Sequence, residues 1–145
     1  MREFTFTFII FALIIYFSGC GSGIQTINVA YSSNINANGG NAVVINIYQL
    51  TNDYKFQNAS SNSLLKDAEE TLANDLIPPI IEKTMVPNED HYLELELSKD
   101  AAFIGVVGEF HSPSIDGWRH IIPVDSDTEY LKILIFENSL SLQKE

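Results

Sequence analysis

Hydrophobic and polar residues alternate along much of this chain with a period of two, which is typical of half-buried β-strands. The clearest case is the segment 91–97, HYLELEL, in which leucines alternate with glutamates. Alternation, β-branched residues in 42–50 and a nearly continuous apolar run in 102–110 predict strands. Their ranges are 24–31, 42–50, 80–86, 91–97, 102–110, 118–124, 130–136 and 139–142. Seven to eight short strands at regular spacing predict a mainly β protein, a β-sandwich.

A helical period interrupts these strands between residues 60 and 76. Leu64, Ala68 and Leu72 recur at spacings of four, and acidic residues occupy the remaining face. We expect Pro78–Pro79 to end this segment, because proline cannot continue a helix. The pattern therefore predicts a helical insertion in the sandwich, as one helix or as two short ones broken near Ala73–Asn74.

Two further segments indicate local structure. Residues 32–41, SSNINANGGN, are rich in Asn and Gly, so they predict a long surface loop, either a binding loop or a connector. Gly105 and Gly108 within a predicted strand indicate a bulge or the close approach of another backbone. Trp118–Arg119 follow on the next strand, where Arg119 can stack on an aromatic ring or pair with Glu109.

The first residues read as a targeting segment rather than as part of the fold. Arg2 precedes an apolar stretch from Phe4 to Phe17, which is shorter than the roughly 20 residues that span a bilayer. Small residues follow directly, as in a signal peptide, although an uncleaved anchor is an alternative. We therefore assign 1–19 to a signal peptide of lipoprotein type and 24–145 to the folded domain.

The only cysteine of the chain, Cys20, stands at the end of this segment. A single cysteine excludes a disulfide within the chain, and a catalytic thiol would lie in a folded pocket. The sequence from Phe17 to Cys20, FSGC, resembles the bacterial lipobox, which implies a covalent diacylglycerol and an N-acyl chain on Cys20. Residues 20–23 would then form the lipidated N-terminus and a short tether. In lipoproteins of this type, an aspartate directly after the cysteine resembles a signal for retention in the inner membrane. Gly21 stands at that position here, which favours the outer membrane.

Charge and residue content narrow the function classes. The formal net charge of −11 argues against binding to nucleic acid. The chain has three histidines, His91, His111 and His120. They could bind a zinc ion only together with other ligands, such as Asp116 or Asp125, so we favour surface positions for them. No Gly-x-Ser-x-Gly elbow occurs within the predicted domain. We predict no catalytic residues, no metal and no cofactor apart from the covalent lipid.

Several of these segments together resemble one family. They are the lipobox cysteine, the Asn-Ile-Asn loop with its glycines, the strand AVVINIYQL that ends in Tyr48–Gln49–Leu50, the later strand FIGVVGEF, and Trp118–Arg119. In this order and spacing they resemble the TssJ lipoproteins of type VI secretion systems. Within the resemblance, Tyr48, Gln49, Trp118 and Arg119 are structural or interface positions.

The resemblance implies a transthyretin-like β-sandwich with added helices, anchored at the periplasmic face of the outer membrane. It implies a structural role in the type VI membrane complex: binding the periplasmic C-terminal region of the inner-membrane protein TssM, with no small-molecule substrate. The loop residues that this contact would use are Asn34, Ile35, Asn36, Asn38, Gly39 and Gly40. A periplasmic ligand-binding or adhesion lipoprotein is the alternative, and a metallohydrolase would rest on the three histidines alone.

Overall fold

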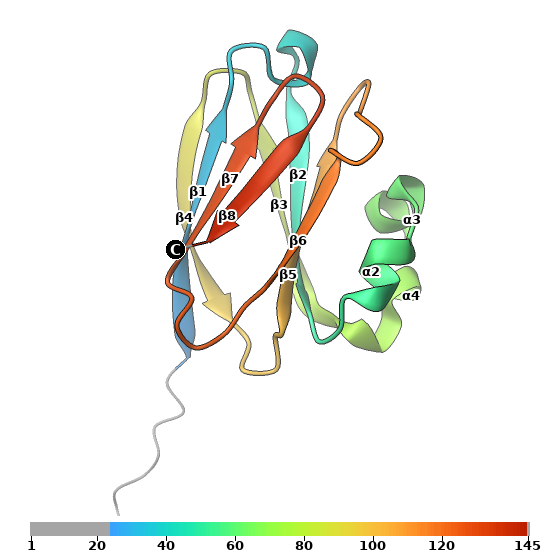
Figure 1. Cartoon of the computed structure of the whole chain (residues 1–145), viewed down its shortest axis with the longest axis vertical. Coiled ribbons are helices and arrows are strands. Elements are labelled where there is room, and N and C mark those ends of the chain that lie inside the picture. Colours follow the sequence, from blue (N-terminus) through green and yellow to red (C-terminus); the bar gives the residue numbers. More distant parts are fainter. Residues whose placement is uncertain (1–23, 145) are drawn as a thin grey trace, which may run out of the picture.

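A computed structural model describes residues 24–144. They form a sandwich of two four-stranded sheets with a helical insertion on one side (Figure 1). The signal peptide assigned to 1–19 and the segment 20–23 with Cys20 lie outside the described residues. The strands are β1 (Gln25–Ser33), β2 (Val43–Leu50), β3 (Leu76–Met85), β4 (Asp90–Leu97), β5 (Phe103–Glu109), β6 (Arg119–Pro123), β7 (Tyr130–Ile135) and β8 (Leu140–Lys144).

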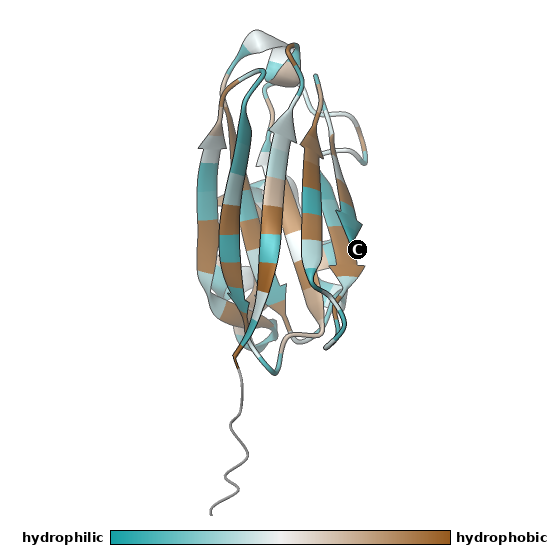
Figure 2. Cartoon of the chain, turned by 90° about the vertical axis from the view of Figure 1, so that its left-hand side faces the viewer, coloured by the Kyte–Doolittle hydropathy of each residue, from teal (hydrophilic) through white to brown (hydrophobic). Residues whose placement is uncertain are grey.

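The two sheets have the strand orders β4-β1-β7-β8 and β3-β2-β5-β6. All neighbouring strands are antiparallel except β1 and β7, which run parallel. The eight strands confirm the mainly β sandwich that the alternation predicts. Bands of hydrophobic and hydrophilic residues alternate along the strands (Figure 2), and the inward residues form one core between the sheets. In β4 the glutamates point to solvent while Leu95 and Leu97 are buried, as predicted.

The helical insertion differs from the prediction of one helix, or two, over 60–76. It consists of three short helices, α2 (Tyr54–Asn58), α3 (Ser61–Lys66) and α4 (Ala68–Leu72), followed by the 3-10 turn η3 (Ala73–Asp75). The chain leaves helical geometry at Asp67, with φ −130° and ψ 37°, as well as at Ala73, where a break was predicted. These turns allow each helix to bury one large apolar side chain against the sheet.

Pro78 and Pro79 do not end a helix, contrary to the prediction. The helical segment has already ended at Asp75, and both prolines lie within β3. Proline is tolerated there because β3 is an edge strand, which pairs only with β2 and has one free side. From the sequence alone, prolines in an edge strand cannot be distinguished from prolines that end a helix.

A second core joins the helices to the outer face of the sheet β3-β2-β5-β6. Its buried members are Tyr48, Leu50, Phe56, Leu64, Ala68, Leu72 and Val107. A Cβ atom at Gly105 would lie 2.6 Å from two ring atoms of Phe56, so glycine is required beneath this ring. Gly108 is likewise approached by the ring of Phe110. The predicted close approach is therefore made by aromatic side chains, not by another backbone.

Candidate interaction surface

Four loops meet at the end of the sandwich that is opposite the start of β1 (Figure 1). They are 34–42, 86–89, 110–118 and 136–139, and we call them together the loop end. Hydrogen bonds connect the first loop to the others: the Asn38 N–H donates to the Phe136 carbonyl at 3.2 Å, and the Asn88 N–H donates to the Asn34 carbonyl at 3.3 Å. The loop end is thus one connected unit on a rigid sandwich.

The Asn-rich loop is ordered rather than a loose connector. It contains the 3-10 turn η2 (Ala37–Gly40), in which Asn38, Gly39 and Gly40 have φ values of 49°, 63° and 82°. Glycine and asparagine adopt this left-handed region more readily than other residues, which explains the composition of the loop. Ala37 is fully buried in the main core and holds the turn against the sandwich.

Asn38 fastens this turn to its neighbours. Its side chain is 3% exposed, donates from Nδ2 to the Ala42 carbonyl at 2.6 Å and accepts at Oδ1 from the His111 N–H at 2.7 Å. Its own N–H donates to the Phe136 carbonyl. Among the predicted contact residues, Asn38 therefore has a side chain that is fully engaged inside the molecule, whereas Asn34, Asn36, Gly39 and Gly40 are exposed.

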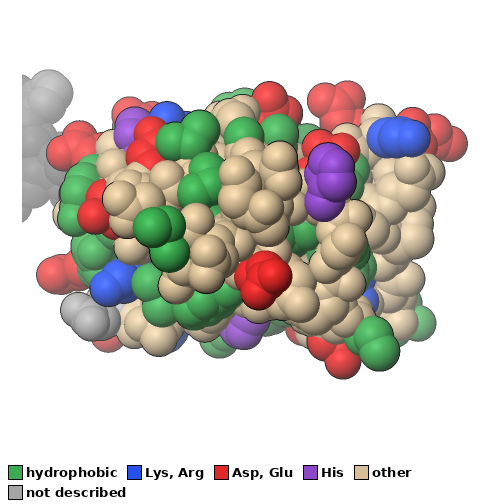
Figure 3. Space-filling view, turned by 90° about the horizontal axis from the view of Figure 1, so that it is seen from above, with side chains coloured by type: hydrophobic (Ala, Val, Ile, Leu, Met, Phe, Trp, Pro, Cys, Tyr) green, Lys and Arg blue, Asp and Glu red, His purple; other side chains and the backbone are tan. Residues whose placement is uncertain are grey.

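Ile35 is the apolar tip of the loop, with 68% of its surface exposed. The other three loops each add an exposed apolar side chain, namely Val86, Ile115 and Phe136. Seen from above (Figure 3), the loop end shows polar side chains and backbone with apolar and acidic side chains among them. Val86 and Phe136 were not singled out from the sequence. Each is an apolar residue directly before turn residues, and this pattern could have indicated an exposed position.

Tyr48 and Gln49 are buried structural residues. The Tyr48 hydroxyl donates to the Leu64 carbonyl at 2.8 Å, and burial, with a smaller effect of the nearby Glu82 carboxylate, raises the pKa of Tyr48 to about 12. Gln49 donates from Nε2 to the Glu96 carbonyl and accepts at Oε1 from the Ser98 N–H, so it links β2 to the other sheet. Neither side chain is on an exposed surface.

Arg119 fixes the insertion to β6. Its guanidinium lies 4.6 Å from the centre of the Trp118 ring and donates to the carbonyls of Phe56 at 2.8 Å and Ala59 at 2.7 Å. Of the two alternatives for Arg119, stacking on an aromatic ring is the one that the structure shows. The alternative pairing with Glu109 is wrong, because the two ion pairs of residues 24–144 join Lys55 to Asp75 and Lys144 to Asp125.

The part of the chain that the structure describes holds neither a metal-binding cluster nor a membrane-spanning helix. No group of three or more His, Cys, Asp or Glu side chains within residues 24–144 is arranged to hold a metal ion. In the same range, no helix is long and apolar enough to cross a membrane. What the fold does offer is a rigid β-sandwich with a connected loop end, the architecture of a binding or scaffold domain.

The chain belongs to the family described as "Type VI secretion lipoprotein, VasD, EvfM, TssJ, VC_A0113", whose model matches residues 25–142. This confirms the resemblance on which the sequence interpretation depends. Members of this family are structural lipoproteins of the secretion system, not enzymes. No curated protein matches the chain.

Solved structures share the fold. The type VI lipoprotein TssJ1 from Pseudomonas aeruginosa is 19% identical, with a TM-score of 0.78 over 85% of this chain and 98% of that chain. Lip from Serratia marcescens, described as a membrane-bound component of the type VI secretion system, is 22% identical, with a TM-score of 0.72 over 82% and 97%. A chain in a structure described as "T6SS protein TssM C-terminal domain (869-1107) from EAEC" is 24% identical, with a TM-score of 0.70 over 83% and 98%.

Proposed function

We propose that this protein is an outer-membrane lipoprotein that anchors the type VI membrane complex by binding the periplasmic C-terminal region of a TssM-like inner-membrane protein. Lipid on Cys20 would supply the attachment, and the loop end would supply the contact. The observation that carries the proposal is the position of the loop end, at the opposite end of the sandwich from the start of β1 (Figure 1).

The length of β1 sets the distance between these two ends. β1 has nine residues, and a strand rises about 3.3 Å per residue, so it extends about 30 Å. Cys20 precedes the first described residue, Ile24, by only four positions. An acyl anchor on Cys20 would therefore hold the start of β1 near the membrane and direct the loop end towards the periplasm.

The loop end has the chemistry of a small docking surface. Ile35 offers an exposed apolar side chain, and Val86 and Phe136 add exposed apolar area on other loops of the loop end. Asparagines and glycines surround Ile35 with exposed backbone and amide groups that can hydrogen-bond to a partner. In this proposal Asn34, Ile35, Asn36, Gly39 and Gly40 contact TssM.

Asn38 has a different role in the proposed contact. Its bonds to Ala42 and His111 hold the turn in its left-handed conformation, so it positions the loop from within. A surface that is already rigid loses less conformational entropy on binding than a floppy loop would.

The similarity to a chain from the TssM structure supports the choice of partner. The TssM segment named there, 869–1107, is longer than this whole chain of 145 residues. However, 83% of this chain suffices to cover 98% of the matched chain. The matched chain is therefore shorter than the named TssM segment. This length fits a second, different chain in the same structure.

The test is an affinity measurement by isothermal titration calorimetry, with the full chain in detergent and the purified periplasmic C-terminal region of TssM from the same organism. Ile35→Asp should weaken binding at least about fivefold, since a buried interface anchor contributes about 1–3 kcal/mol. Tyr54→Asp is the matched control, because Tyr54 is 72% exposed but lies on α2, far from the loop end. Equal affinities of wild type and Ile35→Asp would remove the loop from the contact.

A further inference from the structure

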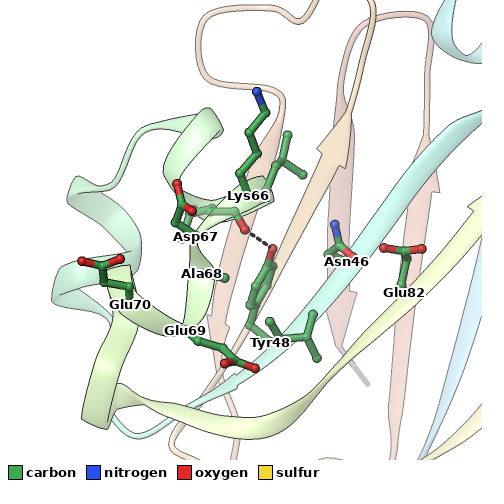
Figure 4. A pocket seen from close by; sticks show the side chains of 11 residues that line it. Asn46, Tyr48, Lys66, Asp67, Ala68, Glu69, Glu70 and Glu82 are labelled. Atoms are coloured by element: carbon green, nitrogen blue, oxygen red, sulfur yellow. Dashed lines mark hydrogen bonds between the residues drawn. The ribbon is translucent and has the colours of Figure 1, made fainter.

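A second surface with the features of a binding site lies on the side of the sandwich, between helices α3 and α4 and the outer face of strands β2 and β3 (Figure 4). It is a groove of about 460 Å³, within the size range of binding pockets. It is separate from the loop end, so it is not part of the proposed contact with TssM.

The groove is strongly acidic. Four carboxylates line it, Asp67, Glu69 and Glu70 from the helical segment and Glu82 from β3, against the single basic residue Lys66. Neither of the two ion pairs found within residues 24–144 uses any of these four carboxylates. Their negative charge is therefore available to a cation that enters the groove.

The second observation is a buried amide that lacks a partner. The buried polar side chains are those of Ser33, Asn38, Asn46, Gln49 and Thr128. Four of them are hydrogen-bonded within the chain. The structure gives the Asn46 side chain no hydrogen-bond partner in residues 24–144, although it is only 7% exposed. Buried amides are almost always paired with protein groups or with water, so the free end of this amide must be open to solvent or to a ligand.

The position of Asn46 shows where this amide is open. Asn46 lies directly across from Glu82 in the β2–β3 pairing, and both side chains face the groove (Figure 4). Within residues 24–144, the Tyr31 hydroxyl alone is an enclosed side-chain polar atom without a partner. The Asn46 amide must therefore reach open space, and the groove is the open space that it lines.

We propose that this groove, around Asn46 and Glu82, binds a lysine- or arginine-bearing segment of a partner protein. The basic side chains would be neutralised by the four carboxylates, and the Asn46 amide would hydrogen-bond to the backbone or to a guanidinium. Charge complementarity favours a basic partner over a second copy of this chain, which carries a net charge of −11. The free edge of β3 lies beside the groove and leaves room for an extended segment.

The probe for this proposal is a fluorescein-labelled peptide of alternating lysine and valine, measured by fluorescence anisotropy against the full chain in detergent. The double variant Glu69→Gln/Glu82→Gln should weaken binding about tenfold or more. The control Glu94→Gln/Glu96→Gln changes the net charge by the same amount on the exposed face of β4, and it should weaken binding less than twofold. Equal losses in both pairs, or no binding to wild type, would overturn the proposal.

Asn46→Val separates a binding role from a structural one. Valine removes the unpaired amide and suits a strand, so the variant should bind the peptide more weakly while its melting temperature stays equal or rises. A lower melting temperature would show that Asn46 serves the fold and would overturn the proposal. Ile35→Asp should leave peptide affinity unchanged, so this test is independent of the proposed TssM contact.

Discussion

The side-chain oxygen of Asn38 accepts a hydrogen bond from the backbone N–H of His111 at 2.7 Å, although the two residues are 73 positions apart. This bond joins the loop between β1 and β2 to the loop between β5 and β6. The first loop leaves one sheet, at β1, and the second leaves the other sheet, at β5. Together with the bond from Asn38 to the Ala42 carbonyl, it makes the turn at the tip a fixed part of the sandwich.

Asn38→Ala should destabilise the protein by about 2–3 kcal/mol, because it leaves buried backbone groups unpaired and places alanine at positive φ. The measurement is urea unfolding of the full chain followed by circular dichroism. Asn36→Ala is the matched control, since Asn36 is exposed and makes no side-chain capping bond; its effect should stay within about 0.5 kcal/mol. Equal effects of the two substitutions would contradict the role assigned to Asn38.

Gly105→Ala should destabilise the protein by about 1–3 kcal/mol, because the added methyl group would overlap the Phe56 ring. Phe56→Leu alone should also destabilise, since it opens a cavity in the second core. The double variant should lose less stability than the sum of the two single variants, because the smaller side chain makes room for the methyl group. Strictly additive losses would show that the two positions do not share this contact.

Stability should fall at alkaline pH, partly through Tyr48. Burial raises the pKa of Tyr48 to about 12 in the folded protein, against an ordinary value of 10.0. The folded state therefore keeps the proton more tightly, so this contribution is complete below pH 10 and is lost as the pH rises from 10 to 12. Tyr48→Phe should lower stability near pH 7 by about 1 kcal/mol, through the lost bond to Leu64, and should flatten the alkaline decline.

Urea unfolding at a series of pH values, together with tyrosinate absorbance at 295 nm, checks this prediction. The Tyr48→Phe variant should lack the absorbance change near pH 12. Burial also raises the pKa of Tyr31, so a part of the alkaline decline should remain in the variant. An identical pH profile in the variant and wild type would contradict the assignment to Tyr48.

Cys20→Ser should release the protein from the outer membrane, because the proposed acyl chains would have no attachment point. Fractionation of cells followed by immunoblotting measures the distribution. The folded domain should be unaffected, so the variant should appear as intact protein in a soluble fraction with unchanged thermal unfolding. Retention of Cys20→Ser in the outer membrane would contradict the proposed anchor.

All eight strands could be predicted from the sequence. Edge strands such as β4 show it by alternation, and the central strands β2 and β5 by nearly continuous apolar, β-branched runs that are buried on both faces. The helical insertion was predicted less well. Its apolar spacing indicates that Leu64 and Leu72 are buried, but the spacing does not indicate the break in helical geometry at Asp67. Pro78 and Pro79 were misinterpreted because local sequence does not reveal that β3 has only one neighbour.

The candidate site shows the same division. The sequence predicts an exposed loop with Ile35 among polar residues, and the structure has it. The sequence does not show that Asn38 is buried while Asn36 is exposed, because both are asparagines in the same loop. The partners of Asn38 and Arg119 lie far away in sequence, so only the assembled fold shows them.

The most direct test of the central claim is hydrogen–deuterium exchange of the full chain in detergent, with and without the purified periplasmic C-terminal region of TssM. The account predicts that TssM slows exchange in the loop end, at 34–41, 86–89 and 136–139, and leaves the strand amides of β4 unchanged. Protection confined to other parts of residues 24–144, with the loop end exchanging as in the free protein, would contradict it.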